Sequence, residues 1–194
     1  MKHFSELSGA AERVVDVAEA LIQQGGYNGF SYDDVARQVG IKKPSIHHHF
    51  PTKAELVAVV AQRYTHRFRS QLLAIEGKHA KAHQRLIAYA ALFEATYAQD
   101  RRLCVCGMLG AEAQGLPDDV AKEVEHFFSA NMDWLTQAFV AGAAEDGLRL
   151  SATPEAHARL FLCALEGAMV VGRGSATVAG PASVAESLIS LMLP

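Results

Sequence analysis

Most of the residues that could do chemistry lie in one short stretch, KKPSIHHHFPTK, which spans residues 42–53. Its lysines and its three consecutive histidines could hold a metal ion, serve an active site or contact a phosphate backbone. A metal site is disfavoured, because adjacent residues of a helix point about 100° apart and helical histidine ligands usually stand four residues apart. A merely solvated basic face is the stronger alternative to phosphate contact.

Candidates for catalysis elsewhere in the chain are weaker. His79 and His83 stand near an expected helix start and could bind a metal with Glu76, although a solvated helix edge is the more common reason for such a trio. The chain has no nucleophile elbow, no phosphate-binding glycine loop and no His-Glu-x-x-His motif. We therefore expect no catalytic residues, no cofactor and no metal, which makes an enzyme the least favoured class.

The cysteines offer a separate kind of chemistry. The chain has three cysteines, an odd number, and no signal peptide, which favours the reducing cytoplasm over a disulfide scaffold. Arg101 and Arg102 stand just ahead of Cys104 near an expected helix start, where cations and helix amides both favour a thiolate. The alternative is that Cys104 is a small buried hydrophobe. Cys106 lies about 200° around the helix from Cys104, which disfavours a disulfide or a chelate between them.

The charged residues are distributed unevenly along the 194 residues. The net charge is −3, yet residues 35–54 contain four basic side chains and no acidic one. This is a local basic patch on an acidic body, as expected for a protein that contacts a polyanion at one place only. No apolar run approaches the roughly 20 residues of a membrane span, so we expect no membrane partner.

The elements that carry the basic stretch have helical period. A first helix is expected at Ala11–Gln24, ended by two glycines, and a short one at Tyr32–Val39, capped by Ser31. A third helix should begin near Lys43 and end before Pro51. Two short helices joined by a tight link that contains glycine are typical of a helix-turn-helix.

The remaining residues also have helical period and show no strand alternation. Further helices are expected at about 53–75, 81–99, 103–114, 117–146, 154–174 and 181–191. The predicted fold class is therefore all-α, with an N-terminal three-helix helix-turn-helix domain at residues 1–56 and a C-terminal helical domain at residues 57–194.

Residues 11–56 combine the apolar first helix with Gly26-Tyr27, Phe30-Ser31, Val35-Ala36, Val39-Gly40-Ile41, Ser45-Ile46, His49-Phe50, Lys53 and Leu56. With this combination, residues 11–56 resemble the DNA-binding domain of the TetR/AcrR family of repressors. One departure is His47, where the family usually has an aromatic residue. Donors at the start of a recognition helix can reach base edges and phosphates, and the resemblance implies the same face. The predicted DNA contacts are Tyr32, Lys42, Lys43, Pro44, Ser45, His47, His48 and Lys53.

The resemblance also implies that the C-terminal domain binds a small molecule and forms a homodimer. The candidate ligand-binding residues are Tyr89, Phe93, Thr96, Cys104, Met108, Phe128, Asn131, Trp134 and Phe161, although any one of them could be plain core. The candidate dimer residues are Ala164, Leu165, Gly167, Ala168, Val171, Ala185, Leu188, Ile189, Leu191 and Met192, with ordinary core as the alternative. Some family members that sense electrophiles are similar in having a cysteine where Cys104 stands. Cys104 is therefore a candidate sensor for a quinone, an aldehyde or an unsaturated carbonyl.

These expectations define one leading interpretation of the sequence. It predicts a one-component transcriptional repressor in the cytoplasm that binds palindromic double-stranded operator DNA as a homodimer. A small-molecule effector, for which an electrophile is one candidate in view of Cys104, would release it by favouring a conformer that does not bind DNA. The alternatives are an all-helical interaction or scaffold protein and, less favoured, a helical enzyme.

Overall fold

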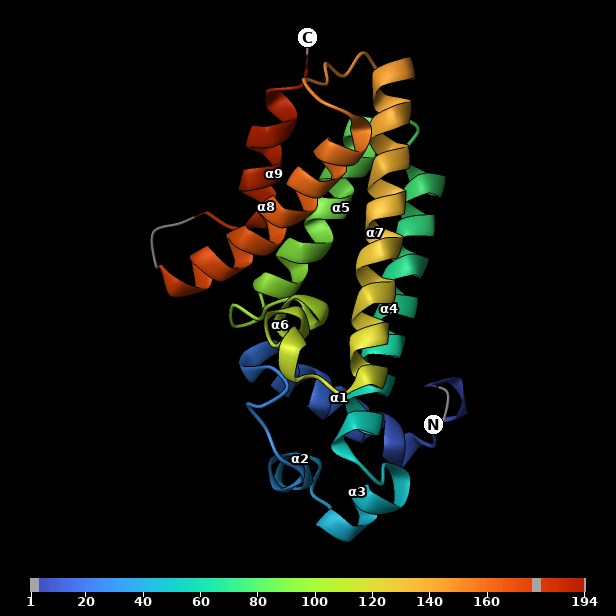
Figure 1. The fold of residues 1–194 in the computed structure, drawn as a ribbon, viewed down its shortest axis with the longest axis vertical. Coiled ribbons are helices and arrows are strands. Elements are labelled where there is room, and N and C mark those ends of the chain that lie inside the picture. Colours follow the sequence, from blue (N-terminus) through green and yellow to red (C-terminus); the bar gives the residue numbers. More distant parts are fainter. Residues whose placement is uncertain (1–3, 176–178, 194) are drawn as a thin grey trace. The chain divides into compact units, whose positions relative to one another are not determined.

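The computed structural model describes residues 4–175 and 179–193, and within them it contains helices and loops but no strand (Figure 1). The all-α fold class is therefore confirmed. The elements in chain order are η1 (Phe4–Glu6), α1 (Gly9–Gly25), α2 (Tyr32–Val39), α3 (Lys43–His49), α4 (Lys53–Lys78), α5 (Ala82–Tyr97), α6 (Val105–Ala111), η2 (Ala113–Gly115), α7 (Asp118–Glu145), α8 (Pro154–Gly174) and α9 (Pro181–Ser190). Within the described ranges, no helix is long and apolar enough to cross a membrane.

The chain forms two compact units that are not continuous in sequence. The first unit runs to Arg67 and also includes Val105–Phe127. The second unit contains Phe68–Cys104 and the described residues from Phe128 onward. The chain therefore passes between the units inside α4, directly after Cys104, and inside α7. The boundary predicted at residue 56 separates a DNA-binding part from a ligand-binding and dimerisation part, and it stays a prediction.

In the first unit, α1 packs against α2, α3 and α6. Ser8 caps α1, because its side chain accepts a hydrogen bond from the backbone N–H of Ala11. Apolar side chains recur along one face of α1 at helical spacing, and this periodicity places them in the core. The fully buried ones are Val14, Val15, Ala18 and Ile22.

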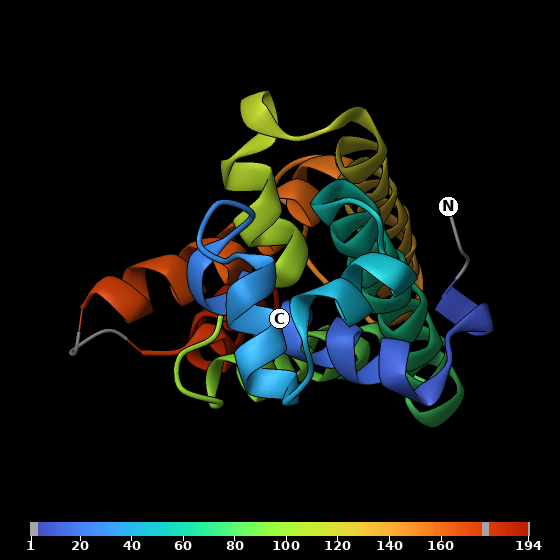
Figure 2. The same cartoon turned by 90° about the horizontal axis from the view of Figure 1, so that it is seen from below.

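The two short helices α2 and α3 are joined by a tight turn, and Figure 2 shows them side by side. Ser31 and Asp34 form a capping box at the start of α2, each accepting a hydrogen bond from the other's backbone N–H. Gly40 ends α2 in the left-handed conformation, with φ of 77°. Ile46 and Phe50 then anchor α3 in the core at 0% and 1% exposure. This is the helix-turn-helix expected from the sequence.

Two arginines on α4 join that helix to α1 within the first unit. Arg63 forms ion pairs with Asp16 at 2.7 Å and with Glu19 at 3.0 Å. Arg67 reaches the other oxygen of Glu19 at 2.5 Å. Because the Glu19 side chain is only 13% exposed and that of Arg63 only 19%, the pair between these two is partly shielded from water and helps to fix α4 beside α1.

The second unit has an aromatic and aliphatic core. Within it, α5 packs on α8 and α9, and α8 packs on α9. Thr153 caps α8, and a proline occupies the first turn of both α8 and α9. The largest side chains of the core include Leu86, Tyr89, Phe93, Trp134, Leu135, Phe139, Phe161 and Leu165.

Candidate DNA interface and buried site

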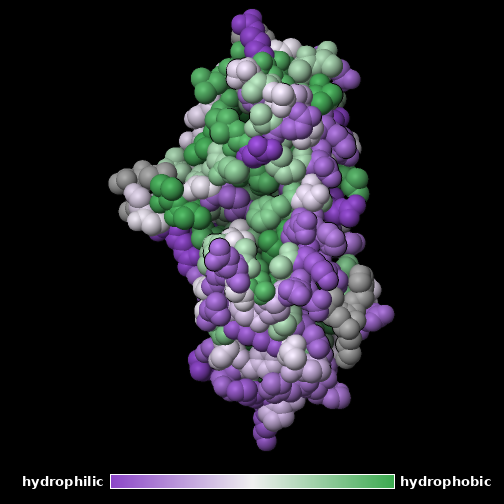
Figure 3. All heavy atoms as spheres, viewed as in Figure 1, coloured by the Kyte–Doolittle hydropathy of each residue, from purple (hydrophilic) through white to green (hydrophobic). Residues whose placement is uncertain are grey.

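The outer face of α3 carries most of the predicted DNA contacts. The helix buries Ile46, while the residues around it are exposed to solvent. The exposed residues among the predicted contacts are Lys42, Lys43, Pro44, Ser45, His47 and His48. In the space-filling view, the surface around α2 and α3 is mostly hydrophilic (Figure 3). The structure thus brings together six of the eight predicted residues on one helix and its start.

The positive charge of this face is partly compensated in the free protein. Lys43 Nζ forms an ion pair with a carboxylate oxygen of Asp33 at 2.8 Å, and Arg37 pairs with Asp34 at 3.3 Å. Within the described residues, Lys42 has no ion pair. Both pairs are largely exposed, so solvent screens them and neither adds much to the stability of the fold. A phosphate can therefore replace Asp33 as the partner of Lys43 at little cost.

Tyr32, the first residue of α2, is largely buried in the free protein, and its role as a DNA contact stays a prediction. Its ring is 6% exposed, and its hydroxyl donates a hydrogen bond to the Phe50 carbonyl at 2.8 Å. Burial raises the pKa of Tyr32 well above the ordinary value, so the phenol stays neutral. The His47 ring packs edge-on against it, with ring centroids 4.8 Å apart. Tyr32 therefore supports the end of α3, and the His47 ring adds an aromatic contact to it.

Lys53 is also held more firmly than the sequence suggests. Its ammonium donates a hydrogen bond to the Phe30 carbonyl and lies 4.2 Å from the Phe30 ring centroid and 4.8 Å from that of Tyr27. Burial lowers the pKa of Lys53, while the nearby carboxylates oppose the change. In this structure the charge stabilises the turn before α2, and it can meet a phosphate only after leaving these partners.

The turn between α1 and α2 is held by a residue from much later in the chain. One carboxylate oxygen of Glu112, which follows α6, accepts hydrogen bonds from the backbone N–H groups of Tyr27 at 2.6 Å and Asn28 at 3.3 Å. Gly26 has φ of 74° and ψ of −167°, a conformation almost restricted to glycine, and a Cβ there would lie 2.9 Å from Glu112 Oε1. Glu112 is not among the site residues predicted from the sequence. Its actual partners depend on how α6 packs on α1, which no local pattern reveals.

Several predicted ligand-binding residues meet in the second unit around Tyr89. The Tyr89 hydroxyl donates a hydrogen bond to Asn131 Oδ1 at 2.7 Å, and its ring stacks on Trp134 with centroids 5.4 Å apart. Phe93 and Phe161 complete the cluster, with centroids 5.4 Å and 6.3 Å from that of Tyr89. The cluster combines aromatic rings with a few hydrogen-bonding groups, as a small-molecule site requires.

Other predicted ligand-binding residues are less closely tied to this cluster. Thr96 is partly exposed and donates its hydroxyl hydrogen to the Leu92 carbonyl of its own helix. Phe128 is partly exposed on α7. Met108 belongs to α6 in the first unit, so it is not assigned to the cluster.

Cys104 is buried, at 1% exposure, and does not lie inside a helix, because α6 begins at the next residue. Its thiol forms a hydrogen bond with the carboxyl group of Glu166 on α8. Burial raises the pKa of Glu166 to about 7, and the hydrogen bond from Cys104 opposes the rise. Sequence reasoning did not single out Glu166. The available signal was a lone acid among the apolar residues of α8, at 162–171.

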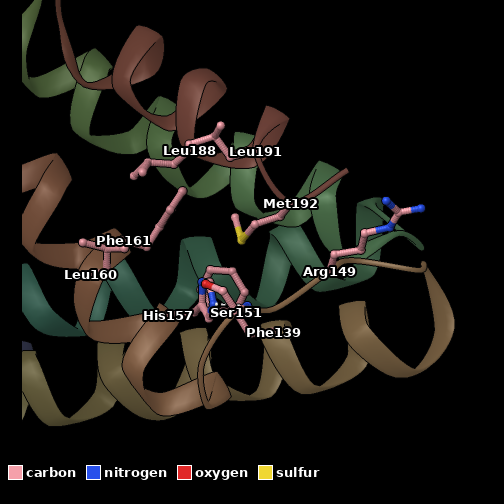
Figure 4. Close-up of a pocket in the computed structure, with 9 residues that line it drawn as sticks. All are labelled: Phe139, Arg149, Ser151, His157, Leu160, Phe161, Leu188, Leu191 and Met192. Carbon is pink, nitrogen blue, oxygen red and sulfur yellow. Dashed lines mark hydrogen bonds between the residues drawn. The ribbon is translucent and has the colours of Figure 1, made fainter. Parts of the chain in front are cut away.

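A separate pocket lies between the N-terminal half of α8 and the C-terminal end of α9 (Figure 4). Its volume is about 520 Å³ when the open solvent at its mouth is included. It is lined by Phe139, Arg149, Ser151, His157, Leu160, Phe161, Leu188, Leu191 and Met192, and of the predicted ligand-binding residues it contains only Phe161. His157 Nε2 accepts hydrogen bonds from the backbone N–H groups of Ser151 and Ala152 at 3.1 Å and 3.3 Å. The imidazole therefore supports the loop before α8.

One face of α8 and α9, called the seam face here, leaves apolar side chains in solvent (Figure 3). Exposed apolar side chains on α8 include Leu160, Val170 and Val171, at 55%, 57% and 54% exposure. Leu191, just after α9, is 80% exposed. The seam face comprises Leu160, Cys163, Gly167, Val170, Val171, Val184, Leu188 and Leu191, all at least partly exposed. Half of the predicted dimer residues are instead core of the protomer, namely Leu165, Ala168, Ala185, Ile189 and Met192.

Comparisons with known proteins agree with this architecture. Residues 14–60 match the family model described as "Bacterial regulatory proteins, tetR family". A TetR-family regulator from Agrobacterium tumefaciens is 34% identical, with a TM-score of 0.85 over 94% of this chain and 95% of that one. A TetR regulator from Legionella pneumophila is 27% identical, with a TM-score of 0.84 over 96% and 99%.

A curated relative, the negative transcriptional regulator IcaR of the icaADBC biofilm operon in Staphylococcus aureus (strain Newman), is 38% identical over 45 residues. That match spans 23% of this chain and 24% of the relative, and thus concerns only the DNA-binding end. These relatives are DNA-binding regulators rather than enzymes, which supports the expectation that this protein is not an enzyme. With the full-length similarity to the Agrobacterium regulator and the match of the helix-turn-helix, the chain belongs to the TetR family of bacterial transcriptional regulators.

Proposed function

We propose that the protein is a homodimeric repressor that binds palindromic operator DNA and is released by a small-molecule effector. The observation that carries the proposal is the exposed outer face of α3, where Lys42, Lys43 and Ser45 cluster at the helix start. Repression, rather than activation, is favoured by the likeness of this part to a negative regulator, IcaR.

In the proposed complex, α3 enters the major groove with its N-terminal end towards the bases. Lys42 and Lys43 contact phosphates, and Lys43 exchanges Asp33 for a phosphate oxygen. Ser45 can donate to or accept from a base edge, and His47 and His48 can donate to bases or phosphates. The hydrogen bond from Tyr32 to Phe50 holds the end of α3 while these contacts form.

The proposed dimer uses the seam face. Val170 and Val171 on α8 and Leu191 beyond α9 are large apolar residues left in solvent, which is costly for an isolated protomer. Gly167 stands one turn before Val170 and Val171 on α8, and a Cβ there would meet nothing within 4 Å, so it would allow helices from two protomers to approach closely. Two recognition helices related by a two-fold axis would then read half-sites about 34–36 Å apart.

The proposed release begins in the second unit and ends at the α1–α2 turn. A ligand at the cluster around Tyr89 and Cys104 acts on the residue that directly precedes α6. At the other end of α6, Glu112 holds the backbone of Tyr27 and Asn28 next to α2. A ligand that prefers a conformer with α6 shifted would loosen this turn and lower the population that can bind DNA.

Selection of bound fragments from random duplex DNA tests the proposal. We expect recovery of a palindrome whose half-sites lie about one helical turn apart and whose affinity falls steeply with salt. Lys43→Ala should weaken binding, whereas Lys122→Ala, an exposed lysine on α7 of the same unit, serves as the matched control. Recovery of no enriched sequence, together with equal affinities of both variants for duplex DNA, would contradict the function.

A further inference from the structure

The His47 ring makes a hydrogen bond that decides which of its nitrogens carries the hydrogen atom. Nδ1 lies 3.2 Å from the backbone carbonyl oxygen of Pro51, while the ring packs edge-on against Tyr32. A carbonyl oxygen can only accept a hydrogen bond, so Nδ1 must be the donor. In a neutral imidazole the other nitrogen then has no hydrogen atom. The Nε2 atom of His47 is therefore a hydrogen-bond acceptor whenever the ring is neutral.

Nε2 of His47 is available to a partner outside the protein. His47 is exposed on the outer face of α3, and within the described residues its Nε2 has no hydrogen-bond partner. The phosphate oxygens of DNA are acceptors as well, so a neutral ring would turn one lone pair towards another. A protonated ring can donate from Nε2 and still keep its hydrogen bond to Pro51. Contact with a phosphate thus requires the protonated ring.

We propose that His47 contacts a DNA phosphate through Nε2–H as an imidazolium, so that each protomer takes up one proton when it binds operator DNA. The proposal rests on the DNA-binding function proposed above and adds a regulation by pH to it. A phosphate is favoured over a base edge because the N-terminal residues of a recognition helix reach the bases. The His47 ring is instead held towards Pro51, which lies beyond the C-terminal end of α3.

The free protein offers His47 no anion that would keep its ring charged. The titratable and charged groups on the elements around it are Tyr32 and Asp33 on α2, Lys43 and His48 on α3, and Lys53 and Glu55 at the start of α4.

None of these groups supplies the missing negative charge. Asp33 is paired with Lys43 at 2.8 Å, and burial raises the pKa of Tyr32, which stays neutral. Within the described residues, no carboxylate lies at ion-pair distance from His47, and no ion pair joins α1 to α3. A phosphate would therefore be the first anion to meet this ring, and it would stabilise the protonated form.

Operator affinity should be highest in mild acid. Because the bound protein holds more protons than the free protein, affinity rises as pH falls. Histidine side chains in general gain their proton below about pH 6.5, and an anion close to the ring extends this range upward. The steepest change should therefore lie between about pH 6.5 and 8. Each proton taken up changes the affinity by up to about tenfold per pH unit, so a dimer that takes up two changes it by up to about 100-fold.

The test uses the full-length protein and the palindrome recovered by selection. Fluorescence anisotropy measures affinity from about pH 6 to 8.5 at constant ionic strength. Isothermal titration calorimetry in buffers of different ionisation enthalpy counts the protons taken up on binding. We expect about one proton per protomer near pH 7.5, and an affinity at least about tenfold lower at pH 8 than at pH 6.

His47→Gln keeps an N–H donor on the side chain and removes the titration. It should take up about one proton fewer per protomer than the wild type and show a flatter pH profile. His48→Gln is the first control, because within the described residues no hydrogen bond fixes the tautomer of His48, and its neutral ring can donate. His126→Gln, at an exposed site on α7 of the same unit, is the second. Both controls should keep the proton uptake of the wild type.

A measurement on the free protein tests the tautomer without DNA. Two-bond proton–nitrogen correlation spectra of the ¹⁵N-labelled protein near pH 8 distinguish the two neutral tautomers, and His47→Gln identifies the signals of His47. We expect the hydrogen atom on Nδ1, as the bond to Pro51 requires. Circular dichroism and melting temperatures establish that the variants are folded.

The proposal is overturned if folded His47→Gln takes up as many protons as the wild type, or if the spectra place the hydrogen atom on Nε2. It is also overturned if wild-type affinity stays constant or rises with pH, since His47 would then accept from a base or make no contact. Palindrome binding without proton uptake leaves the proposed function standing and removes this contact. Failure to bind any duplex at any pH would instead reject the proposed function itself.

Discussion

Replacing Glu112 by alanine should loosen the helix-turn-helix without changing any of the proposed DNA contacts. The substitution removes two hydrogen bonds, to the backbone N–H groups of Tyr27 at 2.6 Å and Asn28 at 3.3 Å. A hydrogen bond to a charged acceptor contributes about 1.5–3 kcal/mol, and only the shorter of these bonds is partly buried. We therefore expect the free energy of unfolding to fall by about 2–3 kcal/mol.

A second substitution in the same turn gives a double-mutant cycle. Gly26→Ala places a Cβ 2.9 Å from Glu112 Oε1 at φ of 74°, which should cost about 1–3 kcal/mol from the backbone alone, and more from the collision. Because part of its cost is that collision, the double variant should be less destabilised than the sum of the single variants. Glu125→Ala, an exposed change on α7 in the same unit, is the control.

The assays are chemical denaturation, for the free energy of unfolding, and fluorescence anisotropy with labelled operator, for affinity. Glu112→Ala should weaken DNA binding in the absence of any effector, because the turn that precedes α2 is no longer held. Wild-type stability, wild-type affinity and simple additivity in the cycle would together refute the role of Glu112.

Three further predictions concern other parts of the molecule. Asp33→Asn should raise the affinity for operator DNA several-fold in anisotropy titrations, because Lys43 loses the carboxylate that competes with phosphate and the proposed DNA-binding surface loses a negative charge. Unchanged or weaker binding would contradict the proposed exchange of Asp33 for a phosphate at Lys43. Val171→Asp should convert the proposed dimer to a monomer in light scattering, since it puts a charge on the seam face. A dimer that persists in this variant would place the interface elsewhere. Glu166 binds its proton more tightly in the folded protein, because burial raises its pKa to about 7 from the ordinary 4.5. The contribution of this group to the free energy of unfolding is therefore fully present below pH 4.5 and is lost as the pH rises to 7. That loss is up to about 3 kcal/mol, and Glu166→Gln should abolish it in urea titrations across this range; an unchanged decline would show that Glu166 is not its source.

The helix-turn-helix was predictable because its signals are local. Ser31 and Asp34 mark the start of α2, Gly40 marks its end, and Pro44 marks the first turn of α3. Each reflects the preference of one residue for one backbone conformation, so a reader of the sequence can place the helices within a few residues. The exposed face of α3 then follows from the period of Ile46 and its neighbours.

The residues that sequence reasoning misplaced or missed depend on packing between distant segments. Tyr32 was predicted to contact DNA, yet in the free protein its hydroxyl donates a hydrogen bond to the carbonyl of Phe50, eighteen residues away in the chain. Glu112 and Glu166 show no motif, and their roles arise only when α6 packs on α1 and when α8 brings its acid to Cys104. Side-chain partners of this kind are set by tertiary contacts, which periodicity does not encode.

The salt dependence of operator binding tests the central claim most directly. Affinities of the wild type and of Lys43→Ala for the selected palindrome are measured by anisotropy from about 50 to 200 mM salt. If each protomer of a dimer loses one phosphate contact, the slope of log affinity against log salt should become shallower by about two, while melting temperatures stay equal. Identical slopes and affinities for two equally folded proteins would contradict the account of α3 as the element that holds DNA.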